Sequence, residues 1–341
     1  MSRAEGSPPA PVTSPGAGFP VDEHRLDEHR LDEHRLDEHR RARPAGPLRP
    51  YVAWYTGYRQ RGVPPARHRG LPSPFLTFII TLDEPLVMLA HPDPRQRPGS
   101  FNTLLGGLHS APALIAHEGA QSGIQVALRP LGTRALLGLP AGELAEIDVP
   151  AEAVLSDLCS ELRTRVLAAT AWPERFAVLD EILLRRMTVT TAGHDVAPEV
   201  GWAWRQLLTS GGAILVSDLA EQTGWSGRHL ARRFREEIGL TPKSAARVIR
   251  FNRARHLLAR HAAAAGPSHP GSGTGAPGGP GTGGYRLADL AAACGYFDQA
   301  HLAREFRALA DCPPSQWLAE EFRNVQAVGD LAGGPWVDQA W

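Results

Sequence analysis

The side chains in this sequence with the clearest chemical potential are arginines that recur at one position of a repeated heptad. The heptad His-Leu-Ala-Arg-Arg-Phe-Arg begins at His229, and His-Leu-Ala-Arg-Glu-Phe-Arg begins 72 residues later at His301. The fourth position is Arg232 in the first copy and Arg304 in the second. A guanidinium can donate two hydrogen bonds to O6 and N7 of guanine. Two helices with arginine at matching places would suit the reading of two stretches of DNA.

The repeat extends beyond the heptad and defines the elements that must position these arginines. Leu219-Ala220 precedes Gly224 in the first copy, as Leu290-Ala291 precedes Gly295 in the second. A proline follows each heptad at the same distance, at Pro242 and again 72 residues later. The sequence therefore predicts one unit, made of helix, glycine turn, helix and proline, that is used twice.

In the first unit we expect a support helix, a tight turn at Gly224 and a reading helix capped by Ser226. The support helix has one apolar face, because its apolar residues lie at helical spacing: Val216, Leu219, Ala220 and Thr223. In the reading helix every fourth residue is apolar and faces inward: Leu230, Phe234 and Ile238. A serine hydroxyl before a helix can accept an unpaired backbone N–H. The predicted DNA-contacting residues are Ser226, Arg228, His229, Ala231, Arg232 and Arg235.

The second unit follows the same plan, with a turn that is one residue longer and Asp298 as the expected cap. Its support helix uses Leu287, Leu290, Ala291 and Cys294, and its reading helix buries Leu302, Phe306 and Leu309. We interpret Cys294 as a core residue rather than a redox sensor, because it holds an apolar helix position. Glutamine can pair with adenine N6 and N7. The predicted DNA-contacting residues are Gln299, Ala300, His301, Ala303 and Arg304.

Charge is distributed in a way that favours a local polyanion-binding face. The whole chain has 36 Lys and Arg against 36 Asp and Glu. Residues 202–260 hold eleven basic against four acidic side chains, whereas residues 1–200 hold twenty-one against twenty-four. A basic segment inside a neutral chain is typical of nucleic-acid binding. The alternative, that these arginines only solvate helix surfaces, fits a single arginine better than a repeated pair.

Two segments lie between the units. Residues 245–260 have helical spacing and would form a linker helix that sets the distance between the reading helices. Successive major grooves on one face of DNA are roughly 34 Å apart. Residues 262–284 are almost entirely Ala, Gly, Pro, Ser and Thr, and we expect a flexible insertion there.

At these residues the chain resembles the AraC/XylS family of transcription regulators, over roughly residues 207–320. The motifs that carry the resemblance are the Leu-Ala-Arg-x-Phe frame, Gly239-Leu240-Thr241-Pro242-Lys243, residues 250–258, residues 295–302 and Cys312-Pro313-Pro314. The resemblance implies two helix-turn-helix units joined by a linker helix, acting at promoters. It assigns base contacts to Arg228, Ala231 and Arg232, and to Gln299, Ala300, Ala303 and Arg304.

Two features depart from the family pattern. Ala231 and Ala300 are too short to hydrogen-bond base edges, although either can touch a thymine methyl. The insertion at residues 262–284 is much longer than the usual join, which puts the rigid spacing of the second unit in doubt.

The first half of the chain reads as strands followed by helices. Residues 75–80 and 86–90 are short runs rich in β-formers, and residues 124–128 alternate with period two. Residues 151–187 change to helical spacing. The region resembles the N-terminal region of actinobacterial-type members of the family, through residues 48–52, 106–109, 121–126 and 130–138. We therefore expect an effector-binding or dimerisation domain, whose ligand-binding residues the sequence leaves unknown.

Histidines offer the only candidates for a metal site, and we interpret them as ordinary polar residues. His91, His109, His117 and Glu118 lack the close His pair of metal-binding cupin barrels. Asp-Glu-His-Arg occurs four times in residues 22–40. A five-residue step turns a helix by about 140°, so the four imidazoles would not converge. We expect no metal and no cofactor, and a solvated tail over residues 1–47.

Cysteines bear on the alternative function, a DNA-modifying or repair enzyme fused to a helix-turn-helix domain. That enzyme would need a reactive thiol, yet Cys159 lies among Leu155, Leu158 and Leu162 in a helical stretch. A buried, inert thiol is the better interpretation. The three cysteines form no CxxC pair, and no catalytic motif is present. We therefore expect a regulator and not an enzyme.

The predicted fold class is multidomain α+β, with a β-rich sensing domain before an all-α domain with two helix-turn-helix units. The predicted ranges are a disordered tail (1–47), a β-rich then helical domain (48–190), a DNA-binding domain (200–325) and a tail (326–341). Within the third, the first unit covers 207–244 and the second 285–320. The expected partners are double-stranded promoter DNA, RNA polymerase and a small-molecule effector, and a homodimer is compatible with the sequence. No apolar run is long enough for a membrane span, so we expect a cytoplasmic, nucleoid-associated protein.

Overall fold

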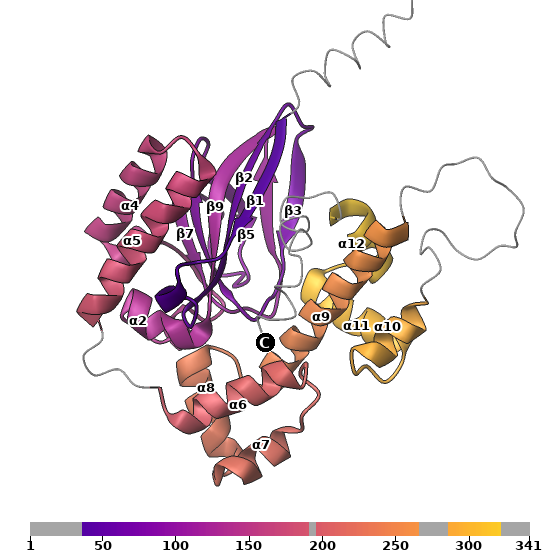
Figure 1. Ribbon diagram of the computed structural model, residues 1–341. Coiled ribbons are helices and arrows are strands. Elements are labelled where there is room, and N and C mark those ends of the chain that lie inside the picture. Colours follow the sequence, from indigo (N-terminus) through magenta and orange to yellow (C-terminus); the bar gives the residue numbers. More distant parts are fainter. Residues whose placement is uncertain (1–35, 191–195, 266–285, 322–341) are drawn as a thin grey trace, which may run out of the picture. The chain divides into compact units, whose positions relative to one another are not determined.

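The computed structural model describes residues 36–190, 196–265 and 286–321. A β region comes first and helices come after it, as Figure 1 shows along the colour ramp. This arrangement confirms the predicted fold class, a β-rich region before an all-α region with two helix-turn-helix units.

Two antiparallel sheets form the β region. The larger one has the strand order β1 (Leu36–Ala42), β2 (Val52–Arg61), β9 (Ala120–Leu128), β4 (Leu76–Thr81), β7 (Thr103–Gly106) and β10 (Asp148–Pro150). The smaller one has the order β3 (Ala66–Gly70), β8 (Ala113–His117), β5 (Leu86–Ala90) and β6 (Gly99–Phe101). The apolar run of β4 is explained by its place inside the larger sheet, where β9 and β7 pair with it on both sides. The strands expected at 75–80, 86–90 and 124–128 are confirmed as β4, β5 and the end of β9.

Helices cover one face of the larger sheet. The short elements are η1 (Gly46–Leu48), η2 (Pro130–Gly132), α2 (Thr133–Leu137), η3 (Ala141–Leu144) and α3 (Glu152–Leu155), and the longer ones are α4 (Asp157–Ala168) and α5 (Trp172–Thr190). The ring of Phe176 in α5 stacks on Tyr55 of β2 at 5.8 Å, and the Tyr55 hydroxyl donates to Asp180 at 2.9 Å. Gly57 is needed below α5, because a Cβ there would lie 2.4 Å from the Trp172 ring.

The first strand corrects our expectation of a disordered tail over residues 1–47. The fourth Asp-Glu-His-Arg repeat lies inside β1, which pairs with β2 from Leu36 opposite Arg61 to Ala42 opposite Tyr55. The edge of β2 offers backbone partners whatever the side chains are. The polar side chains also find partners, since Trp172 donates to Glu38 at 3.2 Å. The first three repeats lie outside the described residues.

Seven helices of the described chain make up the C-terminal region. They are α6 (Pro198–Thr209), α7 (Val216–Thr223), α8 (Gly227–Ile238), α9 (Pro242–Ala265), α10 (Leu287–Ala293), α11 (Gln299–Ala310) and α12 (Pro314–Glu321). The long helix α9 packs against α6 and α8, which precede it in the sequence, and against α10, α11 and α12, which follow it (Figure 1). It is longer at both ends than the linker helix expected at 245–260. The insertion expected at 262–284 is corrected at its start, because residues 262–265 belong to α9; the rest of it lies outside the described residues, as does the expected tail at 326–341.

Candidate nucleic-acid interface and the pocket beside it

The first unit has the turn and the cap that the sequence predicts. Gly224 ends α7 in the left-handed conformation, with φ 70°. The Ser226 hydroxyl caps α8 by accepting the backbone N–H of His229 at 3.2 Å. Leu230 and Phe234 are both fully buried, as is Ile238. The inward face and the N-cap of this reading helix are therefore confirmed.

The outward face of α8 carries the predicted arginines in solvent. Arg228, Arg232 and Arg235 are exposed, and Ala231 is half-buried beside them. Arg232 pairs with Glu236 at 2.8 Å, with 59% of the Arg232 side chain exposed. An exposed pair of this kind contributes about 0–1 kcal/mol, so a phosphate or a base can replace the carboxylate at little cost.

The second unit repeats this geometry. Gly295 takes a positive φ of 73°, and Asp298 caps α11 by accepting the backbone N–H of His301 at 2.6 Å. The predicted inward residues of α11 are buried: Leu302, Phe306 and Leu309. The predicted contact residues Gln299, Ala300 and Arg304 are exposed, and His301 and Ala303 are half-buried.

An aromatic residue after each turn glycine fixes a histidine of the reading helix. Trp225 meets His229 edge-on at 4.6 Å, and Tyr296 meets His301 in the same way at 5.3 Å. His301 also accepts the backbone N–H of Phe297 at Nδ1, at 3.3 Å. Both histidines, which we predicted as DNA contacts, thus help to hold the turn. Sequence reasoning missed this pairing, although an aromatic residue follows the turn glycine in both units.

The C-terminal end of α8 is held against the N-terminal region. Arg134 in α2 donates two hydrogen bonds of 2.9 Å to the carboxylate of Glu237, which is 5% exposed. These hydrogen bonds raise the pKa of Arg134. At Gly142 in η3 a Cβ would lie 2.2 Å from the carbonyl oxygen of Glu236, so the two backbones touch. No periodic signal in the sequence points to this contact, because its members lie about 100 residues apart.

The second unit is held by α9 and by one exposed ion pair to a strand. Arg247 in α9 donates to Glu305 in α11 at 2.8 Å. Arg69 in β3 donates to Glu320 in α12 at 2.8 Å, and the Glu320 side chain is 46% exposed. These contacts leave the N-terminal end of α11 in solvent.

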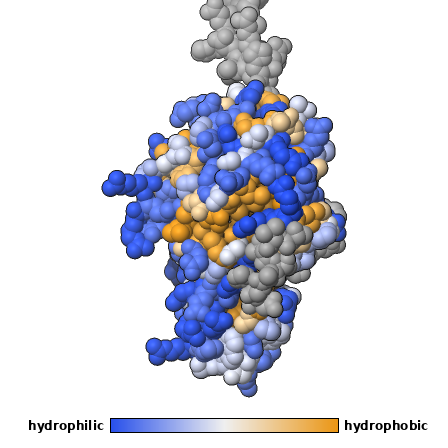
Figure 2. All heavy atoms as spheres, turned by 90° about the vertical axis from the view of Figure 1, so that its left-hand side faces the viewer, coloured by the Kyte–Doolittle hydropathy of each residue, from blue (hydrophilic) through white to orange (hydrophobic). Residues whose placement is uncertain are grey.

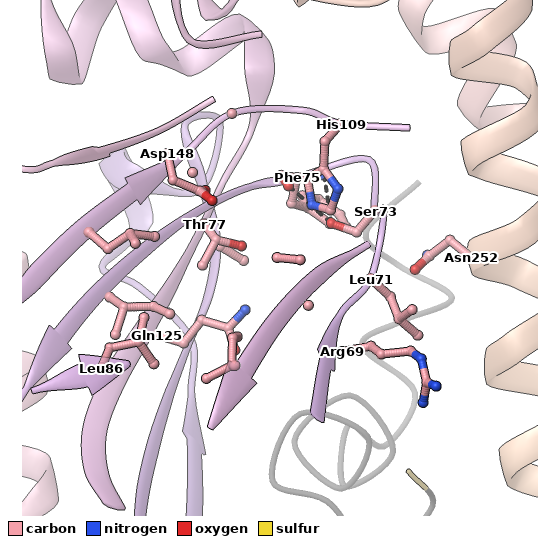
Figure 3. Close-up of a pocket in the computed structure, with 18 of the residues that line it drawn as sticks. Arg69, Leu71, Ser73, Phe75, Thr77, Leu86, His109, Gln125, Asp148 and Asn252 are labelled. Carbon is pink, nitrogen blue, oxygen red and sulfur yellow. Dashed lines mark hydrogen bonds between the residues drawn. The ribbon is translucent and has the colours of Figure 1, made fainter. Parts of the chain in front are cut away.

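A pocket lies between the two sheets, and α9 and α12 also contribute to its lining; Figure 3 shows Asn252 of α9 at its side. Its wall is a separate apolar cluster that does not join the main core: Ile79, Leu86, Met88, Leu104, Ala113 and Ile115. Polar side chains of the N-terminal region and of α9 also line it: Arg41, Arg69, Thr77, His109, Gln125, Asp148, Asn252, Arg255 and His256. Sequence reasoning did not group these residues, since they come from segments far apart in the chain.

The candidate metal ligands do not converge. His91 is 5% exposed and its Nδ1 lies 2.7 Å from Asp148 Oδ2, whereas His109 Nδ1 bonds the carbonyl oxygen of Ala111 at 2.6 Å. His117 Nδ1 accepts the backbone N–H of Gly119 at 3.2 Å. Across the residues that the structure describes, no three His, Cys, Asp or Glu side chains are grouped to hold a metal ion.

The cysteines are buried, as predicted for Cys159 and Cys294. Cys159 is fully buried and donates to Thr103 Oγ1 at 3.4 Å, and Cys294 and Cys312 are each 2% exposed. Burial raises the pKa of the Cys159 thiol, and it raises that of Cys294 to about 11. Because the thiolate is the nucleophile, these are poor candidates for a reactive cysteine.

Known proteins resemble parts of the chain. Residues 40–150 match a domain of unknown function, DUF6597. The HTH-type transcriptional regulator YbfI of Bacillus subtilis (strain 168) is 33% identical over 89 residues, which are 26% of this chain. The chain spans 24% of the length of that relative. In the described helices, none is long and apolar enough to cross a membrane.

Solved structures show only distant likeness. Apo ToxT from Vibrio cholerae aligns over 78% of this chain and 96% of its own, with 10% identity and a TM-score of 0.43. The AraC-like transcriptional activator CuxR aligns over 57% of this chain and 74% of its own, with 12% identity and a TM-score of 0.27. The C-terminal helical region has one capped helix-turn-helix unit on either side of α9, the arrangement implied by the resemblance of its motifs to the AraC/XylS family, and residues 40–150 match the DUF6597 model.

Proposed function

We propose that this chain is a sequence-specific transcription regulator that places α8 and α11 in two adjacent major grooves of promoter DNA. The observation that carries the proposal is the repetition of one reading geometry, in which a capped helix buries one face and exposes Arg232 or Arg304 at its fourth heptad position. Helix-turn-helix proteins read bases with the second helix of the unit. RNA polymerase is the partner through which such a regulator would act, and the nucleoid is where it would do so.

The packing of both units on α9 supports the proposal. Arg247 near the start of α9 donates to Glu305 of α11 at 2.8 Å, and the Phe251 ring of α9 lies 4.9 Å from Phe306 of α11. Because α9 also packs against α8, it holds the two reading helices at one fixed separation. Of its five arginines, Arg247, Arg250 and Arg255 bind groups within the protein, whereas Arg253 and Arg260 are exposed, where a phosphate can reach them.

Selection of bound fragments from genomic DNA, followed by a footprint on the best fragment, tests this function. We expect two protected half-sites about one helical turn apart, one lost in Arg232→Ala and the other in Arg304→Ala. Arg95→Ala removes a charge that is more exposed than Arg232, 87% against 59%, from a loop of the β region and should change nothing. Enrichment of no sequence by the wild-type chain would contradict the proposal.

The pocket is our proposed effector site. Its apolar wall belongs to the sheets, whereas Asn252, Arg255 and His256 belong to α9. A ligand with an apolar body and an anionic group would touch both parts and so favour one arrangement of α9. Melting of the full chain with and without candidate carboxylic acids tests this, because a ligand that binds only the folded state raises the melting temperature. Leu71→Trp narrows the mouth and should abolish the shift; an unchanged shift would place the ligand elsewhere.

Self-association is a further part of the proposal. Figure 2 shows apolar side chains gathered on the face where α4 and α5 lie. Leu167 is 38% exposed there, and Val178 and Leu184 are half-buried. We propose this face as the contact of a homodimer. Sedimentation equilibrium tests it: Leu167→Lys should yield monomers, and a wild-type chain that is monomeric at micromolar concentration would remove the proposal.

A further inference from the structure

One large apolar side chain stands in solvent at the start of the second reading helix. Phe297 is 92% exposed, the highest value for a large apolar side chain among the described residues. It occupies the extra position of the second turn. In the first unit Trp225 directly precedes the cap Ser226, whereas in the second unit Phe297 separates Tyr296 from the cap Asp298.

Helix architecture does not account for this ring. A large apolar residue before an N-cap ordinarily packs against the fourth residue of the helix, in a hydrophobic staple. The fourth residue here is Leu302, which is completely buried while Phe297 remains outside. The Phe297 ring is therefore not buried against Leu302, although its position before the cap would allow that contact.

The backbone around Phe297 is nevertheless fixed. Its own N–H donates to His301 Nδ1 at 3.3 Å. On one side Tyr296 is 4% exposed with its ring against His301, and on the other side Asp298 caps the helix through a 2.6 Å hydrogen bond. The ring thus projects from an ordered turn, not from a loose one.

The place of this turn decides what the ring would meet. Helix-turn-helix proteins bring the N-terminal residues of the reading helix to base edges, and Gln299 and Ala300 begin α11 immediately after the cap. The thymine C5-methyl is the apolar group that base pairs present in the major groove. Phenylalanine is among the side chains that read it by contact.

Charge makes an apolar contact more useful in this unit. Residues 286–321 hold three basic side chains, Arg286, Arg304 and Arg307, against six acidic ones. Attraction to phosphates is sequence-independent and scales with the number of cations. A unit with few cations gains more of its binding from contacts that depend on the base.

We propose that Phe297 is a specificity-determining residue that contacts a thymine methyl in the half-site of α11. The inference rests on the proposed function, because it requires α11 to lie in a major groove. A base step without that methyl would leave the ring against a polar edge and would be bound less tightly.

Replacement of thymine by deoxyuridine, which lacks only the methyl, tests the contact in the full chain. Duplexes carrying the selected site would have each thymine of the second half-site replaced in turn. We expect one position at which the wild type binds the deoxyuridine duplex about 5–10-fold more weakly. Phe297→Ala should bind the thymine duplex as weakly as that and should show no further loss with deoxyuridine. Phe297→Leu, which keeps an apolar group, should recover part of the difference.

Leu215→Ala is the matched control, because Leu215 is also an exposed apolar residue, 64% exposed, at the start of the support helix α7. It should bind every duplex like the wild type. Phe297→Ala should have the melting temperature of the wild type, because the ring is exposed. A loss of binding without a loss of stability would then show that the ring contacts the DNA.

The possible failures are distinct. Equal binding of both duplexes by the wild type at every thymine would overturn the methyl contact and leave the proposed function intact. An equal loss by Phe297→Ala on thymine and deoxyuridine duplexes would also overturn it, and would indicate a wedge between base pairs. Absence of any specific site for the wild type would overturn the proposed function itself.

Discussion

The two helix-turn-helix units share one plan but differ in what holds them. In the first unit a nearly buried carboxylate, Glu237, receives a two-fold hydrogen bond from Arg134 of the N-terminal region. In the second unit the link to the sheets is the exposed Glu320 paired with Arg69. A change in the N-terminal region would therefore reach α8 more directly than α11. Two reading helices with the same local geometry can thus be coupled unequally to the N-terminal region.

The packed interior of each unit should give the largest effects. Phe234 lies 6.0 Å from the Trp204 ring, and Phe306 lies 4.9 Å from Phe251 and 6.1 Å from Trp317. Each phenylalanine is fully buried. Replacement of either by alanine should lower the free energy of unfolding by about 3–5 kcal/mol. Urea unfolding followed by tryptophan fluorescence measures this, and a loss below about 1 kcal/mol at either site would mean that its helices are loosely packed.

Those two variants also compare the units. If the second unit is held less firmly, Phe306→Ala should produce an unfolding step of its own. Phe234→Ala should unfold the first unit together with the N-terminal region. If both variants unfolded in a single transition, the two units would be held equally firmly and the contrast between them would be wrong.

The second largest effects should come from the ion pairs that link each unit to the N-terminal region, and the two pairs should differ in the unfolding free energy that is lost when they are broken. Arg134→Ala leaves Glu237 without this partner in a site where it is 5% exposed, and we expect a loss of about 2–3 kcal/mol, below the range for a fully buried pair. Glu320→Ala breaks an exposed pair and should cost less than about 1 kcal/mol. Urea unfolding at low and high salt measures both. Equal losses would show that the second unit is tethered as firmly as the first.

The exposed arginines of the reading helices should give intermediate effects, on DNA binding and not on stability. Arg232→Ala and Arg304→Ala should each weaken binding to the selected site by about 1–3 kcal/mol and relax discrimination at different base pairs. Titrations on the selected site and on random duplexes measure this. The same loss on both kinds of DNA would mean that these arginines contact phosphates only.

The caps should give the smallest effects. Ser226→Ala should cost about 1 kcal/mol in unfolding free energy. Asp298→Ala should cost slightly more, because a carboxylate at a helix N-terminus adds about 0.3–1 kcal/mol through the helix dipole. Thermal melts measure the difference, with Ser217→Ala, an exposed serine of α7, as the control. A larger loss of stability in Ser226→Ala than in Asp298→Ala would contradict a stabilising effect of the Asp298 charge on the helix dipole.

Local patterns predicted the reading units well. Ser226 and Asp298 were identified as caps from residue type and position, and Phe234 and Phe306 as inward residues from spacing. Such features depend on neighbours within about four residues, which a single sequence displays. The strand at 86–90 was likewise visible as a short apolar run.

Contacts between distant segments were not predictable in the same way. Neither Arg134 nor Glu237 differs in type or spacing from an ordinary surface residue, and only the tertiary structure brings them together. The same holds for His91 and Asp148, which are buried against each other. The strand at 36–42 was missed for another reason, because a polar repeat lacks the alternation by which strands are recognised and takes its hydrogen bonds from the edge of β2.

The packing of α11 on Arg247 and Phe251 of helix α9 fixes the spacing of the proposed DNA site. One residue added to a helix rotates the rest of the chain by about 100° and advances it by about 1.5 Å. One base pair added between half-sites turns the second by about 35° and advances it by about 3.4 Å. No single insertion in the protein compensates for a single insertion in the DNA. Promoters bound through both units would then share one spacing, and evolution could alter their bases one at a time but not the interval between them.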